Sequence, residues 1–258
     1  MSVNILKAER DAIAFLGLMS NMYTKFDTQV NGPDGQPTHT NGLNIHALII
    51  DNATGKVLGL QHNSIHHSNN PLLHAEQLTL KEAVEKKNQL SPRDPATTSV
   101  EEYYRNLLFN DAQSYDALNA GATIYTTLEP CPFCTSALLV SRMKRIVFIT
   151  PDSTYGNSFY SLWTTYYKKY DCHYEQFALE KTNSPLIAKV QGFLSGITAK
   201  IKLMGSIPGT LYFDTLSDDL KAISEYFQAT TEADLITTGQ DLSKNSILLN
   251  ELKAVVYP

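Results

Sequence analysis

Two short segments of the chain hold residue types that bind metal ions and move protons. The first is "PLLHAEQLTLKEA", residues 71–83, in which His74 stands two positions before Glu76. The apolar residues that follow recur with helical spacing, so the pair lies at the start of a predicted helix. Polar residues at a helix start are also compatible with simple solvation. The pair therefore acquires a chemical meaning only if another segment supplies further ligands.

The second segment is "TLEPCPFC", residues 127–134, in which Cys131 and Cys134 are three positions apart. A helix that begins here places both sulfurs on one face of its first turn, and Pro132 suits the first helical position. Helix amino termini favour thiolates, the form that binds metals. A redox Cys-x-x-Cys pair or two buried small residues would also fit. With His74, the cysteines make a zinc ligand set of one imidazole and two thiolates.

Three protein ligands leave the fourth position of a zinc ion open, which is typical of a catalytic site. A water in that position has its pKa lowered to about 7, so zinc-bound hydroxide forms at neutral pH. Glu76, offset from His74 by two residues, is then the expected proton shuttle. A closed structural site would instead need a fourth ligand, from Cys172, His62, His66, His67 or His173. None of these stands in a motif with the other three, so we expect a catalytic Zn²⁺.

Composition and charge narrow the class of protein. The chain has 258 residues, of which 43% are hydrophobic, enough to bury a full core. It shows no secretory signal pattern and no apolar run of membrane-spanning length. Three cysteines, two of them in one motif, argue against a disulfide framework and favour the cytoplasm. The formal net charge of −5 gives no global attraction to nucleic acid, so any RNA or DNA contact would be local.

Strand and helix patterns alternate along the chain, which predicts an α/β protein. The predicted strands are a hairpin over residues 43–62 and the segments 122–128 and 145–150. The predicted helices are residues 5–23, the helix that carries His74 and Glu76, and residues 100–118, 135–143, 158–170, 184–202, 217–227 and 242–254. Both candidate metal segments therefore lie where a loop or strand leads into a helix.

In combination, His74-Ala75-Glu76 and the "PCPFC" of residues 130–134 resemble the signature of the zinc-dependent cytidine deaminase superfamily. Asn63, eleven positions before His74, stands where the branch that holds tRNA adenosine deaminases and guanine deaminases has a substrate-contacting asparagine. The segments "NNPLLHAE" and "SRMKRIVFITPDSTYG" are also similar to that branch. The resemblance covers roughly residues 43–202.

The resemblance implies a three-layer α/β/α fold with a mixed five-stranded sheet, and the chemistry of a hydrolytic deaminase. Zinc-bound hydroxide attacks the carbon that bears an exocyclic amine, Glu76 shuttles the proton, and ammonia leaves. The resemblance also implies substrate contacts from Asn63, Ala75, Glu129 and Pro130. Asn63 would serve equally as a turn residue, and Glu129 as an exposed loop carboxylate. A homodimer is expected from the resemblance alone.

Three additions depart from the family pattern. We expect an N-terminal extension over residues 1–42, a deaminase domain over residues 43–204 with an insert at about 89–120, and an acidic helical extension over residues 205–258. The last segment holds eight acidic and three basic residues, a net charge of −5, which would repel a phosphate backbone. This charge favours a free nucleobase, nucleoside or nucleotide as the substrate.

Two alternatives remain. The first is a base in RNA, as for a tRNA adenosine deaminase, or in single-stranded DNA. "FYSLWTTYYKKYDCHY", residues 159–174, supports it by interleaving aromatics with Lys168 and Lys169. The nearby cations are Arg142, Lys144 and Arg145. The same aromatics recur at helical spacing, as in a packed core or subunit face. The second alternative is a non-catalytic scaffold that bears zinc, against which the intact Glu76 argues.

Overall fold

The structure of the protein is a computed structural model that describes most of the chain. The described residues are 5–25, 30–31, 37–38, 45–90, 121–167, 172–180, 182–203, 213–236 and 240–258. The predicted helix over residues 100–118, most of the predicted insert, and Lys168 and Lys169 lie outside these ranges. No helix within the described ranges has the length and apolar character needed to cross a membrane.

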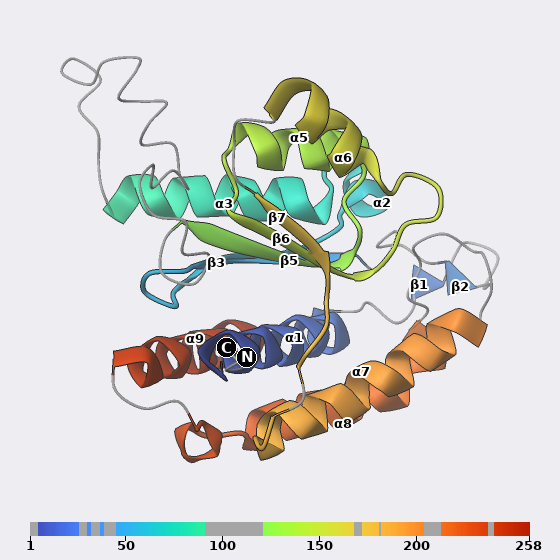
Figure 1. Ribbon diagram of the computed structural model, residues 1–258. Helices are drawn as coiled ribbons and strands as arrows, with labels where there is room; N and C mark the ends of the chain where they lie inside the picture. The colour runs from blue at the N-terminus through green and yellow to red at the C-terminus, as the bar shows by residue number, and fades with distance from the viewer. Residues whose placement is uncertain are drawn as a thin grey trace.

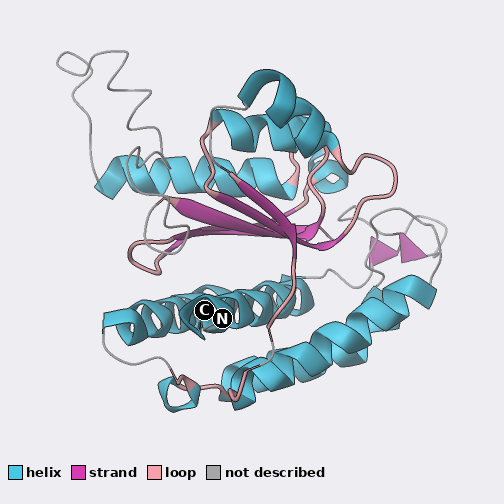
Figure 2. Cartoon of the chain, in the orientation of Figure 1, coloured by secondary structure: helices cyan, strands magenta, loops and turns pink. Residues whose placement is uncertain are grey.

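A mixed five-stranded sheet forms the centre of the molecule, as predicted (Figure 2). Its strands are β3 (His46–Asp51), β4 (Val57–His62), β5 (Ala122–Leu128), β6 (Arg145–Thr150) and β7 (His173–Gln176). The spatial order is β4-β3-β5-β6-β7, with β3 antiparallel to both β4 and β5, and with β6 parallel to both β5 and β7. A separate antiparallel pair consists of β1 (Val30–Asn31) and β2 (Pro37–Thr38).

Helices cover both faces of the sheet, which gives the three layers expected for this fold (Figure 1). The upper face of the sheet in Figure 1 is called the front face here, and the lower one the back face. The front face carries α2 (Ile65–Ser68), α3 (Ala75–Leu90), α5 (Pro132–Val140) and α6 (Ser158–Leu162), which continues into a π-helical turn, Trp163–Tyr167. The back face carries α1 (Ile5–Lys25), α7 (Pro185–Leu203), α8 (Phe213–Ala229) and α9 (Gln240–Val256), with a short 3-10 turn, Glu232–Asp234, before α9.

The alternation of side chains along each strand produces two separate hydrophobic cores. On β3, Leu48 and Ile50 belong to the back core with α1, α7, α8 and α9, whereas Ala47 and Ile49 belong to the front core. The back core holds residues from α8 and α9 together with residues from the sheet. The C-terminal helices therefore share their hydrophobic core with the sheet, although the sequence had suggested an added extension.

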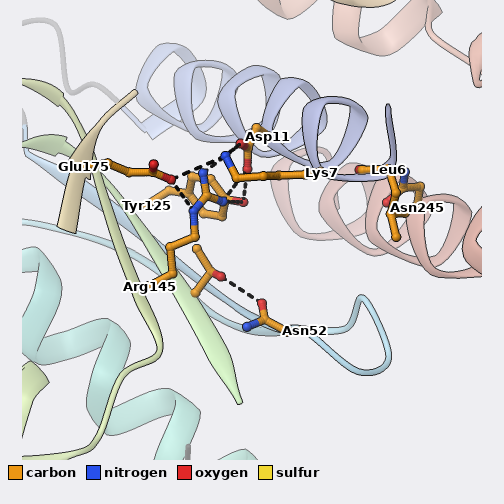
Figure 3. Close-up of polar contacts among 9 residues, drawn as sticks. Leu6, Lys7, Asp11, Asn52, Tyr125, Arg145, Glu175 and Asn245 are labelled. Atoms are coloured by element: carbon orange, nitrogen blue, oxygen red, sulfur yellow. Dashed lines mark hydrogen bonds and ion pairs between the residues drawn. The ribbon is translucent and has the colours of Figure 1, made fainter. Parts of the chain in front are cut away.

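A buried ion pair fixes α1 to the back of the sheet (Figure 3). The Arg145 guanidinium on β6 donates to both carboxylate oxygens of Asp11, at 2.6 and 2.8 Å. The Tyr125 hydroxyl on β5 donates to the same carboxylate at 2.6 Å. Lys7 bridges Asp11 and Glu175 at the rim of this cluster. The N-terminal helix is thus tied to β5 and β6 through the Asp11 carboxylate and to β7 through Lys7.

Strand β4 lies at the edge of the sheet, where its outward backbone groups would be open to solvent or to another strand. Side chains from two helices bond these groups instead. The Val57 N–H donates to Glu251 on α9 at 2.6 Å, and the Leu60 N–H donates to Glu82 on α3 at 3.1 Å. The β4 edge is therefore covered from both faces of the sheet.

Most predicted elements are present, and the differences are local. Strands 122–128 and 145–150 are confirmed at both ends, and the hairpin at 43–62 is observed as β3 and β4. The helix predicted at 135–143 begins earlier, at Pro132, because proline suits the first helical turn. The helix predicted over 158–170 is shorter and changes to a π-helical turn at Trp163. The fifth strand, β7, has no counterpart among the segments predicted from local sequence pattern.

Candidate metal centre and active site

His74 lies directly before α3, at the point where the loop from β4 enters the front layer. Its carbonyl accepts the Leu78 N–H at 3.0 Å, which makes it the residue that opens the helix. Its ring packs edge-on against Phe133 on α5, with the ring centroids 5.7 Å apart. The first turns of α3 and α5 thus meet at this imidazole.

Cys131 and Cys134 are brought to His74 by the turn that follows β5. Cys131 is the residue before α5 and Cys134 lies within its first turn, as the motif predicted. The Cys131 sulfur is 3.9 Å from His74 Nδ1. One ligand atom from each of His74, Cys131 and Cys134 lies within 4.8 Å of the other two. Residues separated by 57 positions along the chain therefore form one compact set of ligands.

The two thiols titrate differently in the metal-free chain. Hydrogen bonds from the Cys134 thiol, and then from His74, lower the pKa of Cys131 to about 4 despite its partial burial. The hydrogen bond to Cys131 and burial raise the pKa of the Cys134 thiol instead. Cys131 is accordingly the first thiolate to form, and the bond to it raises the pKa of His74. A thiolate beside an imidazole is ready to accept a soft cation.

Glu76 lies one residue inside α3 and faces the ligand set. Its side chain is 3% exposed, and its Oε2 has no hydrogen-bond partner among the described residues. Burial raises the pKa of this carboxyl to about 7, and the neighbouring Cys131 adds to the shift. A group with this pKa exchanges protons readily near neutral pH. The carboxyl is therefore buried beside the ligand set, with one oxygen that has no hydrogen-bond partner among the described residues.

The donor set fits zinc. One imidazole and two thiolates are zinc ligands, and three protein ligands with an acidic residue beside them are typical of an open, catalytic site. Among the described residues, no other group of histidines, cysteines and carboxylates is close enough to hold a metal ion. Cys172, a candidate fourth ligand, directs its sulfur to the carbonyl of His173. His62 stacks on His46 at the end of the β3–β4 hairpin, with ring centroids 5.6 Å apart.

Asn63 and Ala75 were both predicted to contact substrate. Asn63 is 2% exposed, directly after β4, and its Oδ1 accepts the Ile65 N–H at 3.0 Å. The asparagine thus forms the turn that starts α2. The sequence had offered this turn role as an alternative to the substrate contact. Ala75 is fully buried as the first residue of α3, and its carbonyl accepts the Thr79 hydroxyl. His66 and His67 fall within α2.

Glu129 is buried, not exposed, and both of its carboxylate oxygens have partners inside the protein. Oε1 accepts the Asn157 N–H at 2.8 Å and the Tyr174 hydroxyl at 2.6 Å, and Oε2 accepts the Asp152 N–H at 3.0 Å. Pro130 is buried beside it and offers its carbonyl to the hydroxyls of Thr135 and Ser158. Glu129 was predicted to contact substrate, but its carboxylate already accepts hydrogen bonds from three donors within the protein.

The aromatic segment after β6 packs largely against the sheet. Phe159 is 3% exposed and stacks on Tyr174, with the ring centroids 4.3 Å apart and the planes within 7°. Trp163 also stacks on Phe159, with the ring centroids 6.3 Å apart. Arg145, proposed as a phosphate contact, has its guanidinium in the buried ion pair with Asp11. The core interpretation holds for Phe159, and Arg145 points to the back face, so it is wrong as a strand contact.

Several residues around the centre were not singled out by the sequence. Asp152 accepts the N–H groups of Thr154 and Tyr155, which closes the turn after β6. Tyr174 reaches Glu129 from β7 across 45 positions of sequence. A short motif cannot encode such a contact. The run "PDSTYG", typical of a turn, was the available signal for Asp152 alone.

Known proteins of similar sequence share the part of the chain that holds this centre. The tRNA-specific adenosine deaminase of Rickettsia felis is 32% identical over 116 residues, which cover 45% of this chain and 62% of that protein. The tRNA-specific adenosine deaminase of Aquifex aeolicus is 29% identical over 102 residues, which cover 40% and 50%. The match therefore spans only half to three fifths of the length of these two relatives.

Among solved structures, one from work on A-to-I editing by tRNA:A34 deaminases is 20% identical, with a TM-score of 0.40, and the match covers 66% of this chain and all of that one. A guanine deaminase from Nitrosomonas europaea is 15% identical, with a TM-score of 0.36 and coverage of 59% and 73%. The family model described as the cytidine and deoxycytidylate deaminase zinc-binding region matches residues 35–150, which include all three candidate ligands. Residues 35–150 of this chain are therefore similar to the cytidine and deoxycytidylate deaminase zinc-binding region, and within them His74, Cys131 and Cys134 lie close enough together to hold a metal ion.

Proposed function

We propose that the chain hydrolytically deaminates the exocyclic amine of a base held in RNA, with adenine the first base to test. The observation that carries the proposal is the buried Glu76 carboxyl, whose Oε2 has no hydrogen-bond partner in the described chain, beside the three zinc ligands. A buried carboxyl oxygen without a partner costs folding free energy. A proton that Glu76 transfers during reaction explains why the carboxyl lies there.

The residues of the centre divide the work. His74, Cys131 and Cys134 would hold zinc, which when bound lowers the pKa of a water to about 7. Glu76 accepts a proton from the attacking water, whose oxygen bonds to the ring carbon that bears the amine. Glu76 passes this proton to the adjacent ring nitrogen. It then carries the proton of the new hydroxyl to the amine nitrogen, the carbon–nitrogen bond breaks, and ammonia leaves behind a carbonyl.

The choice of RNA rests on the relatives and on where the negative charge lies. Six curated relatives of similar sequence are all named tRNA-specific adenosine deaminases. Helix α8, which has four acidic residues and one basic residue, packs on α1 below the sheet in Figure 1, whereas α3 and α5, whose first turns hold the zinc ligands, lie above it. Exposed charges beyond about 8 Å are largely screened at physiological salt. The acidic extension therefore opposes RNA binding at the front face less than its charge alone suggested.

A free nucleobase, nucleoside or nucleotide is the second candidate. It is favoured by the formal net charge of −5, which supplies no general attraction to a phosphate backbone. The burial of Arg145 in its ion pair favours it as well, since this cation cannot reach a bound strand. A base in RNA would also have to leave its stack to reach the centre, a cost that a free base does not carry.

One experiment separates these substrates. The zinc-loaded protein is incubated with tRNA, an RNA stem-loop, single-stranded DNA, and adenine, guanine and cytosine as bases, nucleosides and nucleotides. Ammonia release is measured for all of them, and conversion of adenosine to inosine is measured by mass spectrometry for the nucleic acids. Glu76→Ala is the matched control, because it removes the proton shuttle and keeps the three ligands.

We expect turnover of RNA that disappears in the Glu76→Ala variant. Turnover of a free base or nucleoside, with no reaction on RNA, would replace this proposal by the second candidate. A protein that binds one zinc per chain and deaminates nothing in the panel would support the scaffold interpretation.

A further inference from the structure

The Glu129 carboxylate joins three segments that are remote in sequence. Its donors are the Asp152 N–H from the turn after β6, the Asn157 N–H from the start of α6, and the Tyr174 hydroxyl from β7. Glu129 is 5% exposed, so these bonds are shielded from water. Hydrogen bonds to a buried carboxylate are stronger than those between neutral groups. The carboxylate therefore holds the turn, the helix start and the strand in one arrangement.

The segments held by Glu129 are hydrogen-bonded to the residues that flank the cysteine pair. Glu129 is two residues before Cys131, and Pro130 between them accepts the Ser158 hydroxyl at 3.4 Å. The Ser158 hydroxyl also lies 3.3 Å from the Thr135 hydroxyl, one residue after Cys134. The first turn of α6 is thus bonded on both sides of the cysteine pair. A substrate held at the metal would lie next to these residues.

The backbone of residues 156 and 157 packs closely against the Glu129 carboxylate. Asn157 has a φ of 60°, in the left-handed region. A methyl group added at Gly156 would overlap the Asp152 carbonyl and the Glu129 carboxylate. The hydroxyl of Tyr174 reaches Glu129 while its ring stacks on Phe159, so the aromatic packing beside α5 depends on the same contact.

We propose that Glu129 is a positioning residue whose carboxylate fixes residues 152–157 and Tyr174 as the wall of the substrate site beside the cysteine turn. The inference rests on the proposed deaminase function. It differs from a direct substrate contact, because both oxygens are bonded within the protein. It also differs from a catalytic role, because the carboxylate acts through the groups that it holds.

Glu129→Gln is the main test. An amide replaces one acceptor oxygen by an NH₂ group, which then faces a backbone N–H from Asp152 or Asn157. We expect a rise in KM of about tenfold, since a hydrogen bond to a charged acceptor is worth a factor of ten or more. We expect kcat to stay within about threefold of wild type, because the ligands and Glu76 remain. Zinc content and the absorption spectrum of the Co²⁺-substituted protein are expected to be unchanged.

Tyr174→Phe is the second variant, and Gln176→Ala is its matched control. The first removes one of the three donors and keeps the ring that stacks on Phe159. We expect it to raise KM less than Glu129→Gln does. The second removes a hydrogen bond from the same strand to Ile149, away from Glu129, and is expected to leave KM unchanged.

Amide hydrogen exchange at Asp152 and Asn157 gives a readout that needs no substrate. Both amides are expected to exchange faster in Glu129→Gln than in wild type and to be unaffected in Gln176→Ala. Unchanged exchange, or an unchanged KM in an active protein, would overturn the proposal. Loss of metal with a fall in kcat at constant KM would also overturn it, because Glu129 would then support the ligands. Faster exchange in a protein that deaminates nothing would keep the positioning role and reject the deaminase function.

Discussion

The two faces of the sheet differ in whether a buried carboxyl group has a charged partner. On the back face, the side chains of Asp11 and Arg145 are 1% and 3% exposed, and the carboxylate has the guanidinium and the Tyr125 hydroxyl as partners. On the front face, Glu76 is equally buried, yet its Oε2 has no hydrogen-bond partner in the described chain.

The pKa values follow from this difference. Burial alone would raise the pKa of Asp11, but the Arg145 guanidinium outweighs it and holds the pKa below its usual value. Burial raises the pKa of Glu76 to about 7 with no cation from Arg or Lys to oppose it. The Asp11 carboxylate therefore holds α1 to the sheet, whereas Glu76 has no such cationic partner, as the proposed proton transfer requires. Pairing, more than burial, separates a structural charge from a reactive one.

Removing the carboxyl on the front face should cost activity and no stability. For Glu76→Gln we expect kcat to fall by roughly 10²–10⁴-fold, the range for loss of a general acid–base group. The melting temperature should stay the same or rise, because an unpaired buried carboxyl is replaced by a neutral amide. Steady-state kinetics and thermal unfolding on the same preparation test both parts. Activity within tenfold of wild type would contradict the assignment of Glu76.

Removing the carboxylate on the back face should do the reverse. Asp11→Asn removes the buried one of the two carboxylates paired with the Arg145 guanidinium and leaves only the part-exposed Glu175, which we expect to lower the free energy of unfolding by about 3 kcal/mol. Urea unfolding measures this loss. Glu175→Gln is the control, because its side chain is 38% exposed and bonds the same guanidinium, so a smaller loss is expected. Equal losses in the two variants would argue against a special role for burial.

Metal removal should lower the stability of variants with an intact ligand set and leave that of the ligand variants unchanged. With free zinc at a hundred times the Kd, binding stabilises the folded chain by about 2.7 kcal/mol. A chelator should therefore lower the melting temperature of wild type and of Asp11→Asn. It should have no effect on His74→Ala or Cys134→Ser, which lack a ligand. An equal chelator effect in these ligand variants would place the metal elsewhere.

A smaller, pH-dependent effect is expected from His46 on the back face. Burial and the neighbouring His62 lower the pKa of His46 to about 3, and its Nδ1 lies 2.9 Å from the Asn21 amide. The unfolded chain binds this proton below about pH 6.5 and the folded chain does not, so stability is present above that pH and falls as the pH drops toward 3. The loss is about 1.4 kcal/mol per pH unit within this window.

Unfolding of wild type and of His46→Gln between pH 7 and pH 4.5 tests this sign. The variant should show a shallower decline with falling pH. Substitution of the exposed His173 should leave the wild-type slope intact. A wild-type chain whose stability does not decrease below pH 6.5 would show that His46 is protonated in the fold.

What could be predicted from sequence follows from how local each signal is. The zinc ligands and Glu76 lie in two short motifs, and the strands at 122–128 and 145–150 are apolar runs, of which the first is buried along its whole length. The fifth strand is four residues long, with its ends exposed, so it has neither an apolar run nor a clear alternation. It is a strand because its backbone pairs with β6.

The surroundings of the centre were harder to predict for the same reason. Glu129 was expected to contact substrate or to lie in an exposed loop. The structure instead bonds it to groups 23, 28 and 45 positions away. Arg145 lay in a cationic stretch of sequence, and only the tertiary arrangement turns it toward Asp11. Contacts of this range depend on which strands become neighbours, which local patterns do not specify.

The two carboxylates that bind backbone N–H groups of the edge strand β4 also bear on aggregation of the chain in solution. An open strand edge recruits strands from other chains, and proteins protect such edges against aggregation. Here Glu251, on the last helix, occupies the Val57 N–H, and Glu82 occupies the Leu60 N–H. A chain whose C-terminal helix has detached would keep its zinc ligands and present a self-complementary edge. Helix α9 is thus expected to protect the protein against aggregation from the side of the sheet opposite to the zinc ligands.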